Sequence, residues 1–414
     1  MPGRARTRGV HERGAMPERR GSCVSAVPRL NPERLMTRLD ALAAVGATAE
    51  GGCCRLALTD EDRAGRDLVT AWMRELGLAI SIDPVGNLFG RRAGAPGSDD
   101  LAPVMTGSHI DTVRTGGRYD GNYGVLAGLE AVQALDEAGV RTRRPLVVAV
   151  FTNEEGARFQ PDMLGSLVYA GGLTLTDAHA TRAIDGALLR DELARIGYLG
   201  DAPLPLCRPH AFVELHIEQG PVLDAEGVTI GAVRDLQGIS WQALTITGQS
   251  NHAGTTPMRL RHDAGHGAAA VACFVRALAD DMGGSQVATV GSLKLHPDLI
   301  NVIAARAELT VDLRNTDEAL LQQAEHRLAR FLDELSEKDG LVIETRRLAR
   351  FEPVHFDAGV ADLVGSIAGR LGHSHRPMTS GDGCVRGARR CGRRDRRHRH
   401  RSAPARSEPA GASR

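Results

Sequence analysis

A continuous apolar run at 145–151, Pro-Leu-Val-Val-Ala-Val-Phe, ends shortly before the acidic pair Glu154 and Glu155. Such a run is typical of a strand that is buried on both faces of a sheet. A second apolar strand is expected at 102–106, leading to His109, and an amphipathic helix lies between the two strands. Strand, helix and strand in this order predict an α/β sheet with a functional site at the carboxyl ends of its strands.

After Gly227 the pattern changes to that of a second unit. It predicts strands at 239–247, 286–295, 305–313 and 341–348, and helices at 263–278 and 316–335. The predicted fold class is therefore α/β, with a central mixed sheet flanked by helices in one domain. The second unit reads as an α+β, ferredoxin-like domain inserted in the first.

The chain divides into five predicted parts. They are an N-terminal extension at 1–30 that is expected to be disordered, a first catalytic part at 31–230, the inserted domain at 231–348, a second catalytic part at 349–383 and an Arg-rich segment at 384–414. The last segment has no Leu, Ile, Phe, Tyr, Trp or Met, so it cannot build a core. We interpret it as a disordered end or an aberrant sequence rather than as a nucleic-acid-binding tail.

Composition excludes several classes of partner. The formal net charge is zero, which gives no argument for nucleic acid or an anionic membrane. No run of about 18 apolar residues is present, so no transmembrane helix is expected. The seven cysteines are scattered without a Cys-x-x-Cys pair, and no secretory signal precedes them, so we expect a cytoplasmic protein.

Imidazoles and carboxylates gather in a few short motifs. These are Gly-Ser-His-Ile-Asp at 107–111, Gly-Gly-Arg-Tyr-Asp-Gly at 116–121, the Glu154–Glu155 pair and Glu-Leu-His-Ile-Glu-Gln-Gly at 214–220. A donor set of His, Asp and Glu without Cys suits Zn²⁺, with Mn²⁺ or Co²⁺ as alternatives. In an adjacent glutamate pair, one side chain can bind metal while the other accepts a proton. Taken singly, each residue also fits an ordinary role as a core histidine, a turn residue or a solvated acid.

Five ordered motifs give the chain a resemblance to a known family. They occur at 107–113, 116–121, 154–159, 214–223 and 251–258, the last reading Asn-His-Ala-Gly-Thr-Thr-Pro-Met. Residues 35–382 resemble the dinuclear-metal amidohydrolases that comprise N-carbamoyl-L-amino-acid hydrolase, allantoate amidohydrolase and β-ureidopropionase, which are relatives of the aminoacylase-type metallopeptidases. The resemblance implies a small-molecule substrate.

The resemblance also implies two divalent metal ions per subunit, with Zn²⁺ expected first and Mn²⁺ or Co²⁺ as alternatives. His109, Glu155 and His216 match terminal metal ligands, and Asp120 matches the carboxylate that bridges the two ions. Glu154 matches the general base that takes a proton from water and later gives it to the leaving nitrogen.

Further residues match positions that orient groups or bind substrate. Asp111 is expected to orient His109, and Gln219 to line the site. His252 matches a residue that stabilises the oxyanion from the partner subunit of a homodimer. Asn301 and Arg314 match residues that bind the substrate carboxylate, a task suited to the planar guanidinium of arginine, although Arg314 also fits a surface ion pair. The inserted domain would act as a lid and carry the dimer interface.

The chain departs from the family after Met378. The family has a fifth metal ligand, a His, in a Ser-Gly-x-x-His-Asp-Ala motif, whereas this chain continues from Ser380-Gly-Asp-Gly into Cys384 and the Arg-rich segment. A frameshift explains the change, because Gly-Ala-Arg-Arg-Cys at 387–391 can be encoded so that the next frame reads Ala-His-Asp-Ala. We expect the gene to carry that second frame, and a DNA sequence without it would contradict the hypothesis.

The predicted function is metal-dependent hydrolysis of a linear amide or ureido C–N bond, most simply in an N-carbamoyl amino acid or a related ureido acid. One alternative is an aminoacylase or dipeptidase on the same scaffold. Another is a catalytically impaired relative that lacks the fifth metal ligand. Neither nucleic acid nor a membrane is an expected partner.

Overall fold

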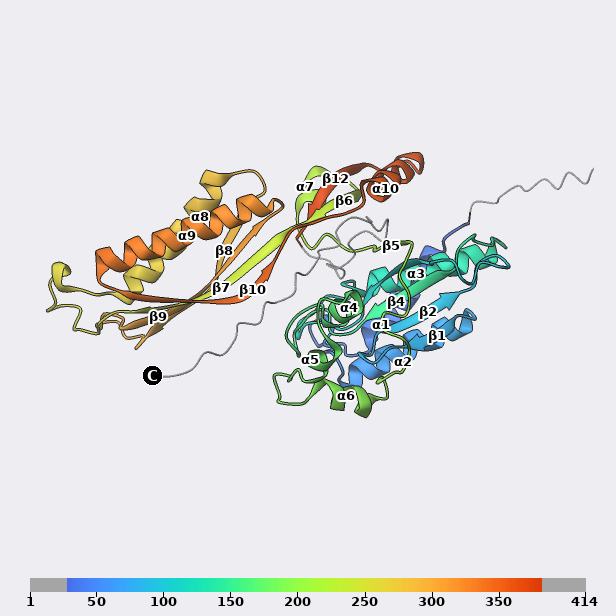
Figure 1. Cartoon of the computed structure of the whole chain (residues 1–414), viewed down its shortest axis with the longest axis horizontal. Coiled ribbons are helices and arrows are strands. Elements are labelled where there is room, and N and C mark those ends of the chain that lie inside the picture. The colour runs from blue at the N-terminus through green and yellow to red at the C-terminus, as the bar shows by residue number, and fades with distance from the viewer. Residues whose placement is uncertain (1–27, 382–414) are drawn as a thin grey trace, which may run out of the picture.

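The computed structural model describes residues 28–381. Most of the predicted N-terminal extension and the Arg-rich segment lie outside the described residues. The proposed frameshift at 387–391 lies outside them as well. The described part of the chain forms three sheets with helices packed on them (Figure 1).

The first sheet has five strands in the order β1-β2-β4-β3-β5. They are β1 (Ala79–Ile82), β2 (Leu88–Arg92), β3 (Val104–His109), β4 (Leu146–Phe151) and β5 (Ala211–Val213). Strands β3, β4 and β5 are parallel, whereas β1 and β2 pair antiparallel, so the sheet is mixed. The apolar run at 145–151 forms β4, and all but its first residue are buried, as predicted.

Helices on both faces of this sheet enclose its core. Residues of α1 (Pro32–Ala44), α2 (Asp60–Glu75) and α3 (Asn122–Glu137) pack together with β2 and β4. A second apolar cluster joins α4 (Leu164–Ala170), α5 (Leu175–His179) and α6 (Leu189–Ile196). Asn31 and Thr59 cap α1 and α2 with their side chains, which explains why these helices begin at Pro32 and Asp60.

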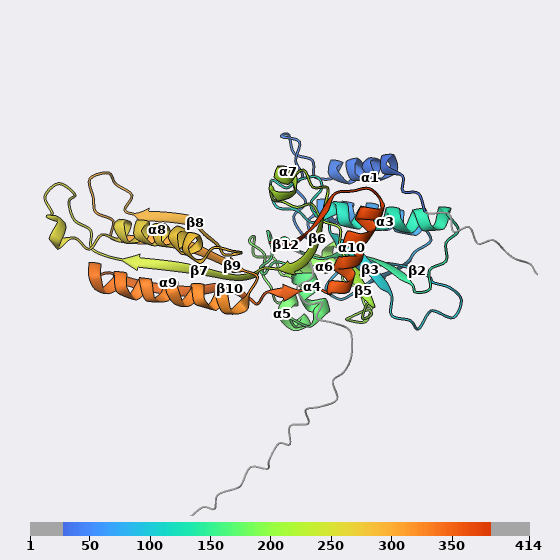
Figure 2. The ribbon, with the colours of Figure 1, turned by 90° about the horizontal axis from the view of Figure 1, so that it is seen from above.

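The second sheet has four antiparallel strands in the order β10-β7-β9-β8. They are β7 (Gly238–Thr247), β8 (Val287–His296), β9 (Arg306–Asn315) and β10 (Val342–Phe351), joined through α8 (Ala264–Met282) and α9 (Glu318–Asp339). The order β-α-β-β-α-β is that of ferredoxin-like folds, and the unit has its own apolar core. It extends away from the first sheet in both views (Figures 1 and 2).

A three-stranded sheet lies between these two units. It contains β6 (Ile230–Leu236), β11 (Val354–His355) and β12 (His375–Ser380), in the order β11-β6-β12, and α10 (Ala358–Arg370) packs on it. Residues 231–236, expected in the inserted domain, thus belong to this sheet. Within the described residues, β12 does not pair with β5, so the two predicted catalytic parts form separate sheets rather than one.

A cavity of about 2120 Å³ separates the first sheet from the three-stranded sheet. The short helix α7 (Val222–Glu226), the end of β5, β6 and α10 contribute to its walls. Among the described residues, no helix is both long enough and apolar enough to cross a membrane. The mixed α/β fold class is confirmed.

Candidate metal centre

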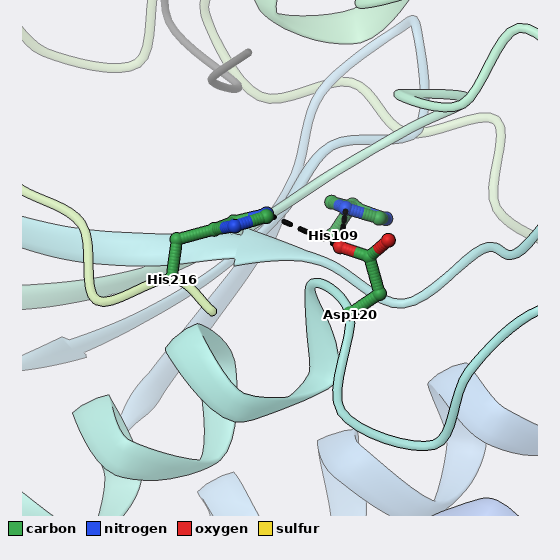
Figure 3. Close-up of side chains that lie close together, drawn as sticks. All are labelled: His109, Asp120 and His216. Carbon is green, nitrogen blue, oxygen red and sulfur yellow. Dashed lines mark ion pairs between the residues drawn. The ribbon is translucent and has the colours of Figure 1, made fainter. Parts of the chain in front are cut away.

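Three predicted ligands converge at the carboxyl edge of the first sheet (Figure 3). His109 is the last residue of β3, Asp120 lies in the loop before α3, and His216 follows β5. One ligand atom from each lies within 4.8 Å of the other two. Asp120 Oδ1 is 3.2 Å from His216 Nε2 and 3.8 Å from His109 Nε2, so the carboxylate stands between two imidazoles. Two imidazole nitrogens and a carboxylate oxygen form a donor set that fits Zn²⁺, Mn²⁺ or Co²⁺.

A glycine next to Asp120 allows His109 to approach this loop. Gly121 has φ +63°, and a Cβ there would lie 2.5 Å from the His109 ring. Any other residue would therefore strain the backbone and push the imidazole away. The Gly-Gly-Arg-Tyr-Asp-Gly motif thus provides a carboxylate and the space beside it.

Asp111 is expected to orient His109, and in the structure its backbone carbonyl makes the contact. His109 Nδ1 lies 2.9 Å from the Asp111 carbonyl oxygen but 3.9 Å from Asp111 Oδ1. The carboxylate instead accepts hydrogen bonds from the backbone N–H groups of Glu154 and Glu155, both at 3.2 Å. Asp111 therefore connects the His109 loop to the acidic pair.

The turn after β4 directs the acidic pair. Asn153 adopts a left-handed φ of +52°, and its side-chain amide donates to the Phe159 carbonyl at 2.8 Å. Glu154 is 8% exposed, and its Oε2 lies 3.4 Å from His109 Nε2. Glu155 is half-buried beside it, and it does not belong to the group of three converging ligands.

Acidic neighbours dominate the electrostatics of the two imidazoles. Burial opposes protonation of His109, but the carboxylates of Glu154, Asp111 and others raise its pKa to about 10. Burial likewise opposes protonation of His216, and the hydrogen bond to Asp120 raises its pKa to about 9. Burial tends to raise the pKa of Asp120, but the hydrogen bond from His216 brings it below its usual value. The centre therefore carries excess negative charge and attracts a cation.

Arg314 and Gln219 lie on the wall of the large cavity together with His216. The Gln219 amide donates to Asp120 Oδ2, which places this predicted residue at the centre. Arg314, near the end of β9, pairs with Asp312 at 2.9 Å and donates to the Gly381 carbonyl at 3.0 Å. Its guanidinium thus borders the cavity that opens on the candidate metal centre.

His252 and Asn301 lie at the other end of the four-stranded sheet. We call residues 248–263 and 297–303 the tip, because they flank the Thr247–Arg306 end of the strand pair β7–β9. In the tip, His252 pairs with Val302, and the Ala253 N–H donates to the Asn301 carbonyl at 2.9 Å. Arg314 is eight residues along β9 from Arg306, or about 25 Å. The structure therefore brings His252 and Asn301 to each other but not to the three ligands.

Comparison with known proteins agrees with this geometry. Residues 105–388 match the model of Peptidase family M20/M25/M40. The chain belongs to this family.

Several named proteins resemble the chain over most of its length. The N-carbamoyl-L-amino-acid amidohydrolase of Rhizobium meliloti is 41% identical over 356 residues, which cover 86% of this chain and 85% of the relative. The allantoate amidohydrolase of Bacillus subtilis is 33% identical, with 83% of each protein covered. A solved amidase of the hydantoinase/carbamoylase family from Burkholderia multivorans is 45% identical, with a TM-score of 0.82 and 86% of both chains covered. The chain is therefore a hydrolase of carbon–nitrogen bonds.

Two residues that support the M20/M25/M40 centre were missed by sequence reasoning. Ser108 Oγ donates to Glu214 Oε1 at 2.6 Å and so ties the end of β3 to the segment that carries His216. His216 Nδ1 also lies 2.7 Å from the Ile217 carbonyl. Ser108 is one residue from His109, and Glu214 is two residues from His216. This position inside the ligand motifs is the feature of the sequence that could have pointed to a supporting role.

Proposed function

We propose that the chain hydrolyses the carbamoyl or ureido C–N bond of an N-carbamoyl amino acid or a related ureido acid. The observation that carries the proposal is the convergence of His109, Asp120 and His216 beside the Glu154–Glu155 pair. Relatives named N-carbamoyl-L-amino-acid amidohydrolase and allantoate amidohydrolase support the substrate class.

His109, Asp120 and His216 would hold the first divalent ion. Asp120 and Glu155 would contribute to a second, for which the histidine of the family motif is missing after Ser380. When bound, divalent ions polarise a carbonyl group and lower the pKa of water. The protein supplies the arrangement of the donors, since Asp111 and Gln219 fix their direction. Zn²⁺ is the expected ion, with Mn²⁺ or Co²⁺ as alternatives.

Glu154 would move the proton in this reaction. Its carboxylate is largely shielded from solvent and lies 3.4 Å from His109 Nε2, on the side of the ligands. There it can accept a proton from the attacking water and return it to the leaving nitrogen. Its backbone is held by Asp111, so the carboxylate does not depend on a mobile loop for its position.

The cavity beside the centre would receive the substrate. Among the polar groups on its wall, Arg314 would pair with the carboxylate of a small acid and Gln219 with its amide. A guanidinium binds a carboxylate through two parallel hydrogen bonds. The Asp312 contact occupies Arg314 Nε, so the substrate carboxylate would meet the terminal nitrogens.

A second copy of the chain would bring His252 and Asn301 to the centre. These residues lie at the exposed tip, about 25 Å along β9 from Arg314. The tip also exposes apolar side chains that suit an interface, namely Met258, Leu260, Leu299 and Ile300. The proposed active form is thus a homodimer in which the four-stranded unit acts as the lid and dimerisation domain.

A substrate panel tests the proposed function. Protein loaded with Zn²⁺, Mn²⁺ or Co²⁺ is assayed on N-carbamoyl-L-amino acids, allantoate, N-acetyl amino acids and dipeptides. Turnover of carbamoyl or ureido compounds, abolished by a chelator, is the expected result. Turnover of N-acetyl amino acids or dipeptides alone would support the aminoacylase alternative and contradict the proposal.

Complementation tests the shared site. Glu154→Gln and His252→Ala are each expected to be inactive, but a mixed dimer contains one site with both native residues. Random mixing of equal amounts should restore about a quarter of wild-type activity. Mixtures that stay as inactive as the separate variants would show that His252 does not act across a dimer.

A further inference from the structure

Arg55 is a buried cation without an acidic partner. Its side chain is fully buried, and no carboxylate of the described residues lies within ion-pairing distance of it. Each of its three side-chain nitrogens nevertheless donates to an oxygen. A buried charge persists only where such bonds replace the lost water, so the arrangement is specific.

The end of helix α1 compensates the charge. Arg55 Nη1 donates to the carbonyl oxygens of Leu42 at 2.9 Å and Val45 at 2.7 Å, in and just after the last turn of α1. The Leu42 carbonyl also accepts from the Val45 N–H at 3.2 Å, and the carbonyls at the C-terminus of a helix form the negative end of its dipole. No residue of the last turn is basic, so Arg55 supplies the cation from elsewhere in the chain.

The other two nitrogens reach the two loops that carry metal ligands. Arg55 Nε donates to the Ile110 carbonyl at 2.7 Å, between His109 and Asp111. Arg55 Nη2 donates to Asn122 Oδ1 at 2.9 Å. The loop that ends at Asp120 is held in turn, because Asn122 Nδ2 donates to the Arg118 carbonyl at 3.1 Å.

The backbone of Arg55 contributes to the same connection. Its N–H donates to Thr112 Oγ1 at 2.7 Å, and its carbonyl accepts from the Thr112 N–H at 2.9 Å. The neighbouring Cys53 pairs with Gly116 through two backbone hydrogen bonds. The chain at 53–55 is therefore hydrogen-bonded to residues 112–116, which connect the two ligand-bearing loops.

We infer that Arg55 is a positioning residue that sets the distance between His109 and Asp120, an inference that rests on the proposed metal centre. The planar guanidinium holds its nitrogens at fixed angles, so the Ile110 carbonyl and the Asn122 amide are aligned by one rigid group. A lysine ammonium retains the charge but cannot span both loops. Partners that orient metal ligands typically change metal affinity by about 10- to 100-fold when replaced.

Metal affinity in three variants tests this role. Arg55→Lys keeps the positive charge but loses the planar guanidinium that bonds to both loops. Asn122→Ala removes only the hydrogen bonds that connect Arg55 to the Asp120 loop. Leu39→Ala is the matched control, because Leu39 is a buried residue of α1 in the same core and touches neither loop through a hydrogen bond. Affinity for Zn²⁺ is measured by competition with a chromophoric chelator, and thermal stability is measured on the same samples.

We expect Arg55→Lys and Asn122→Ala to bind Zn²⁺ about 10- to 100-fold more weakly than the wild type. Leu39→Ala should lose thermal stability while its Zn²⁺ affinity stays within about twofold. The Co²⁺ absorption spectrum should change in the first two variants and not in the third. Wild-type affinity and spectrum in both variants would overturn the role of Arg55 alone, whereas a wild-type chain that binds no divalent ion would overturn the proposed metal centre as well.

Discussion

The metal centre and the tip carry comparably clear sequence motifs, but their histidines differ in burial and in the contacts that hold them. His109 is 1% exposed and is held by the Asp111 carbonyl and the space above Gly121. His252 is exposed, and the Gly254 N–H that donates to its Nδ1 comes from its own turn. A motif can therefore predict the role of a residue in both places. Packing shows that the first centre is assembled within the chain, whereas His252 and Asn301 lie apart from it, which is why the proposed function includes a second chain.

Glu154→Gln should produce the largest effect. The amide cannot accept the proton, so kcat should fall by about 10²- to 10⁴-fold. Zn²⁺ affinity should change little, since Glu154 is not one of the three converging ligands. The exposed Glu61→Gln serves as the control for the loss of one acid. Full activity of Glu154→Gln in steady-state assays would remove Glu154 from the mechanism.

His252→Ala should give the next effect, a loss of about 10²- to 10³-fold in kcat, because it removes a donor to the developing oxyanion. The exposed His266→Ala on α8 is the control. Metal content measured by atomic emission should stay unchanged in both, since the tip does not contribute to the three ligands. Loss of metal from His252→Ala would contradict the separation of the tip from the metal centre.

Metal binding should depend steeply on pH. In the metal-free protein the pKa values of His109 and His216 are raised to about 10 and about 9, so both hold a proton near pH 7.5. Zn²⁺ must displace these protons, and its affinity should rise with pH. Calorimetric titrations in buffers of different ionisation enthalpy should show release of about two protons. No buffer dependence would contradict the assignment of both ligands.

The metal-free protein should show the opposite trend in stability. A raised pKa in the folded state stabilises the protein below the unfolded value, about 6.5 for histidine, and this contribution is lost as pH rises through about 9 and 10. Thermal denaturation between pH 6.5 and 10 should therefore show falling stability without metal and a smaller fall with Zn²⁺. If stability fell equally with pH in the presence and absence of Zn²⁺, the fall would not come from His109 and His216, and the raised pKa values of these ligands would be contradicted.

Gly121→Ala should have the smallest effect of this series, but it compares the metal centre directly with the four-stranded sheet. The new Cβ would meet the His109 ring at a positive φ, so we expect a loss of more than about 1 kcal/mol in unfolding free energy and weaker Zn²⁺ binding. Gly291→Ala in β8 meets only Thr310 Oγ1, at 3.5 Å, and should stay within about 0.5 kcal/mol. Equal losses in chemical denaturation would show that the metal centre is no more constrained than the second sheet.

Much of the fold was predictable because local signals agreed with it. The run at 145–151 was predicted to be a buried strand and forms β4, whose last five residues are buried. Strand ends were less certain. The strand expected at 102–106 starts at Val104 and continues to His109, and the one expected at 341–348 forms β10 from Val342 to Phe351. The first and last residues of a strand depend on its pairing with neighbouring strands, and a single sequence does not reveal that pairing.

The site was predictable in its ligands and less so in its supports. His109, Asp120 and His216 were recognised from their motifs, and the structure brings them together. Asp111 was predicted to orient His109, but a sequence does not tell whether the carboxylate or the carbonyl of Asp111 meets the imidazole. Arg55 carried no motif at all, since its partners are backbone carbonyls and one amide.

In the proposed function, His109, Asp120 and His216 hold a catalytic divalent ion. The most direct test titrates metal-free protein with Zn²⁺, Mn²⁺ or Co²⁺ while hydrolysis of an N-carbamoyl-L-amino acid is followed, for the wild type and for Asp120→Asn. We predict that wild-type turnover rises in proportion to bound metal, and that Asp120→Asn neither binds the ion tightly nor turns over substrate. Turnover by metal-free wild type, or wild-type metal binding and turnover by Asp120→Asn, would contradict the claim.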